Sequence, residues 1–192
     1  MTRLKITNNF KFYNENNEII DNNNHERFEQ VFAERYIKED DIVLELGARY
    51  GTVSCAINNN LKNKTNQVSV EPDKTVWDAL IFNKTNNNCE FNIIKGFISN
   101  KKLNLNYNGY GSNFTEDNNS ESDIQNYTLN DIKEKYNLNF NVLVADCEGY
   151  LETFFNENTN VYNELDMVMF EEDRKDLCNY KNIKKNLVNN GF

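Results

Sequence analysis

The sequence predicts an α/β domain in which helices cover both faces of a doubly wound, mostly parallel β-sheet. Short apolar segments alternate with segments whose apolar residues recur at helical spacing, an order typical of βαβ units. The expected strands are mostly apolar, as strands buried on both faces are: 42–46, 67–71, 91–94, 141–145 and 167–170. An acidic residue stands at the end of four of them, and right-handed crossovers would gather these carboxylates along one edge of the sheet.

Composition limits what the domain can be. The chain has 192 residues, 39% of them hydrophobic, and a formal net charge of −9. We expect one core over residues 41–192, preceded by an arm and a helix in residues 1–40 that pack on it. The absence of a basic stripe argues against nucleic acid as a partner. Four cysteines without a Cys-x-x-Cys pair and one histidine argue against zinc. The sequence has neither a signal-peptide core nor an apolar run long enough for a membrane, which predicts a cytoplasmic protein with no membrane partner.

The elements before the second strand follow from spacing. A helix is expected over residues 26–36, with four apolar side chains in the core: Phe28, Val31, Phe32 and Tyr36. The helix after the first strand should bury Val53, Ala56, Ile57 and Leu61. The first 24 residues could form an edge hairpin or an arm over the site, and the pattern does not decide between them.

The later elements follow in the same way. Asp73 is placed to cap a helix whose inward residues should be Val76, Trp77, Leu80 and Ile81. A short strand is expected within 101–106 and a mobile loop over 109–123. Thr128 and Asp131 form a capping box for the next helix, and a short helix follows the fourth strand. The last helix should carry Leu177, Tyr180, Leu187 and Val188, with Gly191 as its stop.

The turn after the first strand is the first candidate site. Its pattern is Glu45-x-Gly47-x-x-x-Gly51, with Ala48 inside the turn, and it lacks the three glycines that approach a pyrophosphate in dinucleotide-binding folds. An acid with two glycines favours a ligand that has an amino group and no phosphate, and S-adenosylmethionine is such a ligand. The alternative is a purely structural turn.

The second candidate site follows the next two strands. Glu71 lies about 20–25 residues beyond the glycine turn, where a carboxylate can accept the two hydroxyls of a ribose, and Pro72 would line the adenine. Gly96 and Phe97 follow the third strand and are placed to enclose the adenine. The alternatives are an exposed strand-end acid for Glu71 and a core role for Phe97.

The third candidate site is Asp146 with Glu171 and Glu172, at the ends of the fourth and fifth strands. Asp146 would lie beside the sulfonium and could take a proton from an attacking hydroxyl. With the two glutamates it could instead hold Mg²⁺. The alternative is that Asp146 orders the cofactor and Glu171 accepts backbone amides. His25 is expected at the surface or at a helix start.

The motifs together resemble the FkbM family of S-adenosylmethionine-dependent methyltransferases. The matching segments are Glu45-Leu-Gly-Ala-Arg-Tyr-Gly51, Val70-Glu-Pro-Asp73, Ile98-Ser-Asn100, Thr128-Leu-Asn-Asp-Ile132, Val144-Ala-Asp-Cys-Glu-Gly-Tyr150 and Met169-Phe-Glu-Glu172. The resemblance covers residues 41–192 and implies a Rossmann-like class I methyltransferase fold. It also implies O-methylation of a small-molecule hydroxyl, often on a sugar or nucleotide-sugar, in some cases with Mg²⁺.

The chain departs from the family at four places, the first being Glu45, where the family often has Asp. Arg49 replaces a small or amide residue in the glycine loop, and Cys147 stands where valine is common. The family fold continues into two further strands that the sequence beyond 170 does not provide. These departures keep open a non-catalytic binding module of the same fold. A nucleic-acid methyltransferase is a further alternative, but Asp146-Cys-Glu-Gly149 occupies the place of an (Asp/Asn)-Pro-Pro-aromatic segment.

Overall fold

The protein is described by a computed structural model that covers residues 6–107, 112–116 and 124–192. Six strands form one sheet in the order β6-β3-β2-β1-β7-β8, and every neighbouring pair is parallel. Their bounds are Val43–Leu46 (β1), Gln67–Glu71 (β2), Asn92–Ile98 (β3), Gln125–Tyr127 (β6), Val142–Ala145 (β7) and Met167–Phe170 (β8). The predicted parallel sheet is therefore confirmed.

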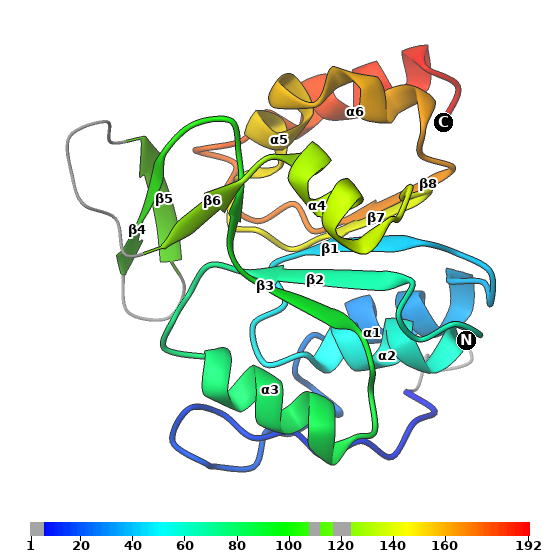
Figure 1. Cartoon of the computed structure of the whole chain (residues 1–192), viewed down its shortest axis with the longest axis vertical. Helices are drawn as coiled ribbons and strands as arrows, with labels where there is room; N and C mark the ends of the chain where they lie inside the picture. Colours follow the sequence, from blue (N-terminus) through cyan, green and yellow to red (C-terminus); the bar gives the residue numbers. More distant parts are fainter. Residues whose placement is uncertain (1–5, 108–111, 117–123) are drawn as a thin grey trace.

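Helices cover both faces of this sheet (Figure 1). One face carries α1 (Arg27–Tyr36), α2 (Thr52–Asn60) and α3 (Trp77–Asn86), and the other carries α4 (Leu129–Tyr136), α5 (Leu151–Glu157) and α6 (Tyr180–Asn189). A 3-10 helix, Thr159–Asn163, follows α5. The largest buried cluster lies between the sheet and α4–α6 and includes Leu44, Ile132, Leu143 and Phe154. This is the doubly wound arrangement that the sequence predicts. Among the described residues, no helix is both long and apolar enough to cross a membrane.

The segment before α1 packs on α3. The side chain of Asn83 donates to the carbonyl of Tyr13 and accepts from the amide of Tyr13, at 2.8 and 2.9 Å. Phe12 is fully buried beside Leu80 and Phe91. These contacts fix the segment against the outer side of α3, and the chain then leads into α1 at the edge of the candidate site.

The side chains that helix α1 buries differ from the expected ones. Val31 is buried, but Phe28, Phe32 and Tyr36 are 58%, 42% and 47% exposed. The helix instead buries Ala33 against α2, and Ile37 follows it into the same cluster. The periodicity located the helix correctly, but three of the four side chains that it assigned to the core are aromatic rings that stay partly exposed. Ile81, Leu177 and Val188 are likewise exposed rather than inward.

After β2 the structure differs from the expectation at three places. Helix α3 begins at Trp77, and Asp73 accepts the amide of Thr75 at 2.8 Å instead of capping the helix. Strand β3 runs on to Ile98, so Gly96 and Phe97 lie within it. The expected short strand exists as β4 (Leu103–Tyr107), but it pairs with a second strand, β5 (Ser112–Glu116), inside the predicted loop. The remainder of that loop, 109–111 and 117–123, lies outside the described residues.

Strand β6 was not predicted at all. It is three residues long, too short to show a pattern, and it pairs with Gly96–Ile98 of β3. Along the chain, the hairpin β4–β5 therefore lies between β3 and β6, which are neighbours in the sheet. In space it lies at the end of the sheet where these strands finish (Figure 1). The capping box of α4 is confirmed, since Thr128 and Asp131 exchange side chain-to-backbone hydrogen bonds. In the described part of the chain no strand follows β8.

Candidate functional site

A cleft of about 760 Å³, open to solvent, lies over the carboxyl ends of β1, β2, β3 and β7. We call it the main cleft. The residues at those strand ends line one side of it, and the hairpin contributes Leu105 and Phe114 to the other. Its position is where open α/β sheets bind ligands.

The loop after β1 forms the floor of the main cleft. The amides of Gly47 and Ala48 both donate to the carbonyl of Val70, at 2.9 and 3.1 Å, which draws the loop across β2. Gly47 has φ +87°, and a Cβ built there would lie 1.7 Å from the carbonyl oxygen of Asp146. Only glycine allows this approach. Gly47 lines the cleft, whereas Ala48 packs into a buried cluster and Gly51 starts α2.

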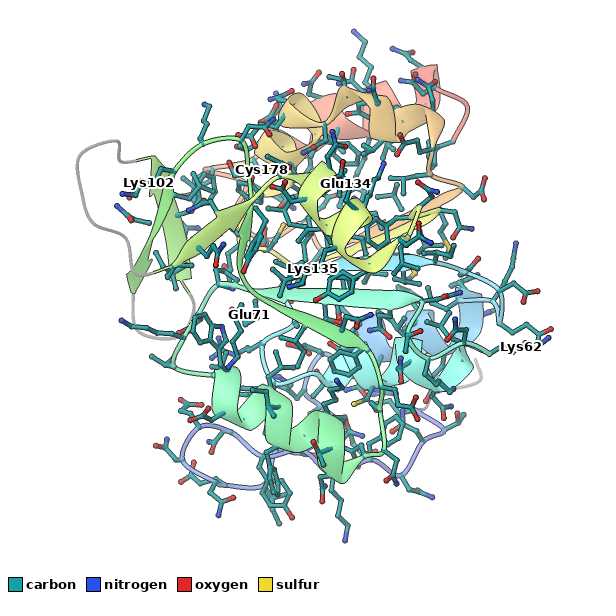
Figure 2. All side chains as sticks on the ribbon, viewed as in Figure 1. Lys62, Glu71, Lys102, Glu134, Lys135 and Cys178 are labelled. Atoms are coloured by element: carbon teal, nitrogen blue, oxygen red, sulfur yellow. The ribbon has the colours of Figure 1, made fainter. Side chains whose placement is uncertain are left out.

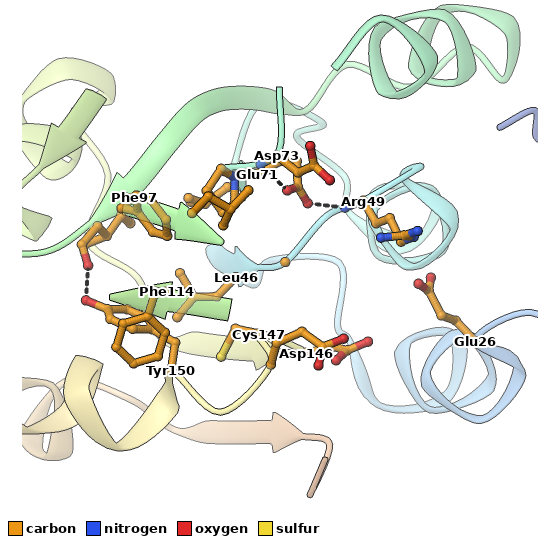
Figure 3. Close-up of a pocket in the computed structure, with 16 residues that line it drawn as sticks. Glu26, Leu46, Arg49, Glu71, Asp73, Phe97, Phe114, Asp146, Cys147 and Tyr150 are labelled. Atoms are coloured by element: carbon orange, nitrogen blue, oxygen red, sulfur yellow. Dashed lines mark hydrogen bonds between the residues drawn. The ribbon is translucent and has the colours of Figure 1, made fainter. Parts of the chain in front are cut away.

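Glu71 lies on one wall of the main cleft, between the end of β2 and the start of α3 (Figure 2). Its Oε2 accepts the amide of Arg49 at 2.6 Å, and its Oε1 accepts the amide of Asp73 at 2.7 Å (Figure 3). Burial raises the pKa of this carboxyl to about 7. Each carboxylate oxygen has a further lone pair, so the group can still accept hydroxyls from a ligand. Pro72 lines the cleft beside it.

Aromatic rings close one end of the main cleft (Figure 3). Phe97 lines it from β3, and the ring of Phe114 meets the ring of Tyr150 edge-on at 4.9 Å. The Tyr150 hydroxyl donates to the carbonyl of Ile98 at 2.7 Å, which fixes the position of the ring. Gly96 does not line the cleft: a Cβ there would lie 2.2 Å from the carbonyl oxygen of Gln125, so its role is close pairing with β6.

Carboxylates occupy the other end of the main cleft. Asp146 follows β7, and Glu26 reaches the same end from the start of α1 (Figure 3). The Thr52 hydroxyl donates to Glu26, and His25 Nε2 lies 3.3 Å from it. Burial first, and then the charges of Glu26 and Glu171, raise the pKa of Asp146 to about 9. Sequence reasoning missed Glu26, since no motif marks it and only the fold brings it to Asp146.

A second cavity, of about 540 Å³, adjoins the first at Leu46, Gly47 and Asp146. We call it the acidic cavity. Apolar residues of α1, α2, β7 and β8 line part of it. Five carboxylate residues line the rest: Glu26, Glu29, Glu45, Asp146 and Glu171.

Glu45 lies in this second cavity rather than in the main cleft. It is only 2% exposed, and its Oε2 accepts the Ser54 hydroxyl at 2.6 Å. Its Oε1 has no hydrogen-bond partner among the described residues. Burial raises the pKa of Glu45 to about 7, against the opposing effect of the bond from Ser54.

The three expected metal ligands are not brought together. Asp146 and Glu171 both line the acidic cavity. Burial raises the pKa of Glu171, and a hydrogen bond that Asp146 donates to it acts in the opposite direction. Glu172 instead faces α6, where it forms ion pairs with Lys184 and Lys175. In the described ranges no group of three or more His, Cys, Asp or Glu side chains could hold a metal ion, so these residues do not form the expected Mg²⁺ site.

Comparison with known proteins gives the class of fold. No protein-family model matches the chain, and no curated protein sequence matches it. A precorrin-6y C5,15-methyltransferase from Geobacter metallireducens matches its structure with a TM-score of 0.52 and 12% identity, over 84% of this chain and 69% of that one. An rRNA methylase from Streptococcus thermophilus gives a TM-score of 0.49 and 8% identity, over 86% of this chain and 78% of that one. The chain has the Rossmann-like fold of class I methyltransferases, and likeness at such low identity shows the fold alone.

Proposed function

We propose that the protein is an S-adenosylmethionine-dependent methyltransferase. The observation that carries the proposal is Glu71: a buried carboxylate at the end of β2, held by the amides of Arg49 and Asp73, on the wall of a cleft at the carboxyl edge of the sheet. A carboxylate at this place can accept both hydroxyls of a ribose. The fold and the position of the cleft support the same ligand class.

The two ends of the main cleft suit the two ends of this donor. The adenine would lie against Phe97 and Pro72, at the aromatic end, where stacking and apolar contact are available. The sulfonium would lie over Gly47, near Asp146, where a negative potential favours a positive charge. Gly47 lets the loop after β1 pack closely on the backbone of Asp146, and Ala48 and Gly51 shape the same loop.

The reaction would be an in-line displacement at the methyl carbon. The acceptor oxygen forms a bond to this carbon while the carbon–sulfur bond breaks, and its electron pair returns to the sulfur of S-adenosylhomocysteine. The positive charge of the bound donor would lower the raised pKa of Asp146, and the carboxylate of Asp146 would then take the proton of the acceptor hydroxyl. Alignment of the two reactants supplies most of the acceleration, and the base contributes about 10²–10⁴-fold.

The acceptor class rests on the motifs. The Thr128-Leu-Asn-Asp131 and Asp146-Cys-Glu-Gly149 segments resemble the FkbM family, which supports O-methylation of a small-molecule or sugar hydroxyl. The carboxylates around Asp146 support an acceptor without phosphate at the reacting end, because like charges repel. This also disfavours a nucleic-acid acceptor.

Titration calorimetry with S-adenosylhomocysteine tests the proposal. We expect one site per chain and a rise in the melting temperature, because a ligand that binds only the folded state stabilises it. Adenosine should bind more weakly, since it lacks the sulfur and the amino-acid end. Neither heat nor a thermal shift with S-adenosylhomocysteine would contradict the proposal. Methyl transfer from labelled donor to a panel of sugars and nucleotide-sugars then tests the acceptor class.

A further inference from the structure

The acidic cavity has an unusual set of walls. Glu26 and Glu29 enter it from the start of α1, Glu45 from β1, and Asp146 and Glu171 from the ends of β7 and β8. No Lys, Arg or His is among the described residues that line it. Its remaining surface is apolar and includes Phe32, Val53 and Met169. A ligand for this cavity therefore needs a positive charge together with a hydrophobic part.

A second and independent observation comes from Glu45. This side chain is almost fully buried in the cavity wall, yet its Oε1 lacks a hydrogen-bond donor in the described part of the chain. Buried acceptors are nearly always bonded, so an orphan of this kind points to a donor from outside the chain. Burial and the neighbouring charge of Glu26 raise the pKa of both Glu45 and Asp146, as expected for carboxyls without a nearby cation.

The lining of the cavity favours an organic cation over a metal ion. The carboxylates do not converge, since the described residues contain no three-residue cluster able to coordinate a metal. The carboxylates and the aromatic ring of Phe32 in the same lining suit an alkyl- or arylammonium group, which gains from charge, from hydrogen bonds and from contact with the ring.

We propose that the acidic cavity binds a protonated amine of the acceptor, so that the methyltransferase acts on an aminated molecule. This assignment rests on the proposed function. The acidic cavity and the main cleft share Gly47 and Asp146, so an amine held among the carboxylates leaves a nearby hydroxyl of the same molecule beside Asp146. The donor also has an ammonium group, and the test must separate the two sources.

Benzylammonium and benzyl alcohol form a matched pair of probes, which differ in charge but hardly in shape. Titration of the full chain, followed by amide chemical shifts, gives the affinity and the location of each. We expect benzylammonium to bind at least about tenfold more tightly and to shift residues around Glu29, Val53 and Met169. Equal affinity for the two probes, or shifts confined to the surroundings of Glu71, would overturn the proposal.

Two variants place the binding on opposite walls. Glu29→Gln and Glu171→Gln should each weaken benzylammonium about tenfold. Glu39→Gln removes the same charge from an exposed site outside the cavity and should leave the affinity unchanged. Equal losses in all three variants would mean that net charge, and not this cavity, attracts the probe, which would contradict the proposal.

S-adenosylhomocysteine separates the two ammonium sources. We expect its affinity to stay within about twofold in Glu29→Gln, because Glu29 does not line the main cleft, and we expect benzylammonium to bind in its presence. Displacement of benzylammonium by S-adenosylhomocysteine would assign the cavity to the donor and overturn the acceptor assignment. No binding of S-adenosylhomocysteine at all, with benzylammonium bound as expected, would contradict the methyltransferase proposal instead.

Discussion

The main cleft and the acidic cavity meet at Gly47 and Asp146, but they treat their buried carboxylates differently. In the main cleft both oxygens of Glu71 accept backbone amides, and Arg49 stands in the same wall. In the acidic cavity Glu45 keeps one oxygen without a partner in the described chain, and the walls contain no basic residue there. The fold satisfies both oxygens of Glu71, whereas one oxygen of Glu45 is left for a donor from a ligand.

This difference shows how one sheet edge can serve two ligands. Backbone amides hold Glu71 in a fixed orientation, which suits a hydroxyl-bearing ligand that must always bind in the same way. Grouped carboxylates without counter-charges favour a cation and discriminate strongly by charge. Asp146 belongs to both walls, so the reacting groups of the two ligands would meet there.

Asp146→Asn should give the largest effect, because it removes the proposed base where the two sites meet. We expect kcat to fall about 10²–10⁴-fold. The affinity for S-adenosylhomocysteine should stay within about threefold, since the amide keeps the shape of the wall. Steady-state kinetics with calorimetry checks both, and Glu39→Gln, which removes an exposed acid outside both cavities, serves as the control. Full activity in Asp146→Asn would exclude Asp146 as the base.

Glu71→Ala tests the main cleft alone. Losing two charged hydrogen bonds to a ribose should weaken S-adenosylhomocysteine by about 100-fold or more. Binding of benzylammonium to the acidic cavity should be unaffected. Glu90→Ala, an exposed acid at the opposite end of the sheet, is the matched control. Unchanged donor affinity in a folded Glu71→Ala protein would show that the ribose assignment is wrong.

Glu45→Gln tests the buried acid of the acidic cavity through stability. Burial raises the pKa of Glu45 from 4.5 to about 7, so the folded state holds a proton that the unfolded state releases. The associated stability, up to about 3 kcal/mol, is present below pH 4.5 and is lost as the pH rises through 7. Melting temperatures from pH 5 to 8 should therefore fall less steeply in Glu45→Gln than in the wild type. Parallel curves would contradict the assignment of this slope to Glu45.

A pair of aromatic truncations gives the smallest expected effects. Phe97→Ala should weaken S-adenosylhomocysteine about tenfold, through lost contact with the adenine, and leave benzylammonium binding unchanged. Phe32→Ala should do the reverse. Titrations of both ligands against both variants check this crossed pattern. Equal effects on both ligands would mean that the two cavities act as one site.

Much of the fold was accessible from the sequence, because its signals are local. The strand at 67–71 matches β2 residue for residue, and Thr128 with Asp131 marks the start of α4 correctly. The prediction that Phe28 and Phe32 are buried was wrong, because a helix with apolar residues on two faces does not reveal which face packs on the core. Strand β6 was not predicted because three residues are too few to show a period. It is defined by its pairing with Gly96–Ile98 of β3.

The candidate site could be predicted in part. Glu71, Pro72, Phe97 and Asp146 all line the main cleft, as expected for residues at the carboxyl ends of parallel strands. The prediction that Gly96 encloses the adenine was wrong, because this glycine allows the close approach of β6 and does not line the cleft.

The contributions of Glu26 and Phe114 arise from tertiary structure. One comes from the start of a helix and the other from a hairpin, and neither carries a spacing signal. No pattern along the chain could have found them.

The hairpin β4–β5, which lies in the chain between the adjacent strands β3 and β6, forms a separate two-stranded unit. Both flanks of the insertion are anchored, since Ser99 donates to Glu157 after β3, and Gln125–Tyr127 pair with β3 beyond the hairpin. Leu105 and Phe114 thus reach the cleft from a hairpin whose two ends are held by the main sheet and α5. Substitutions confined to this hairpin would therefore change the surface that meets a ligand and leave the strand pairs of the main sheet intact.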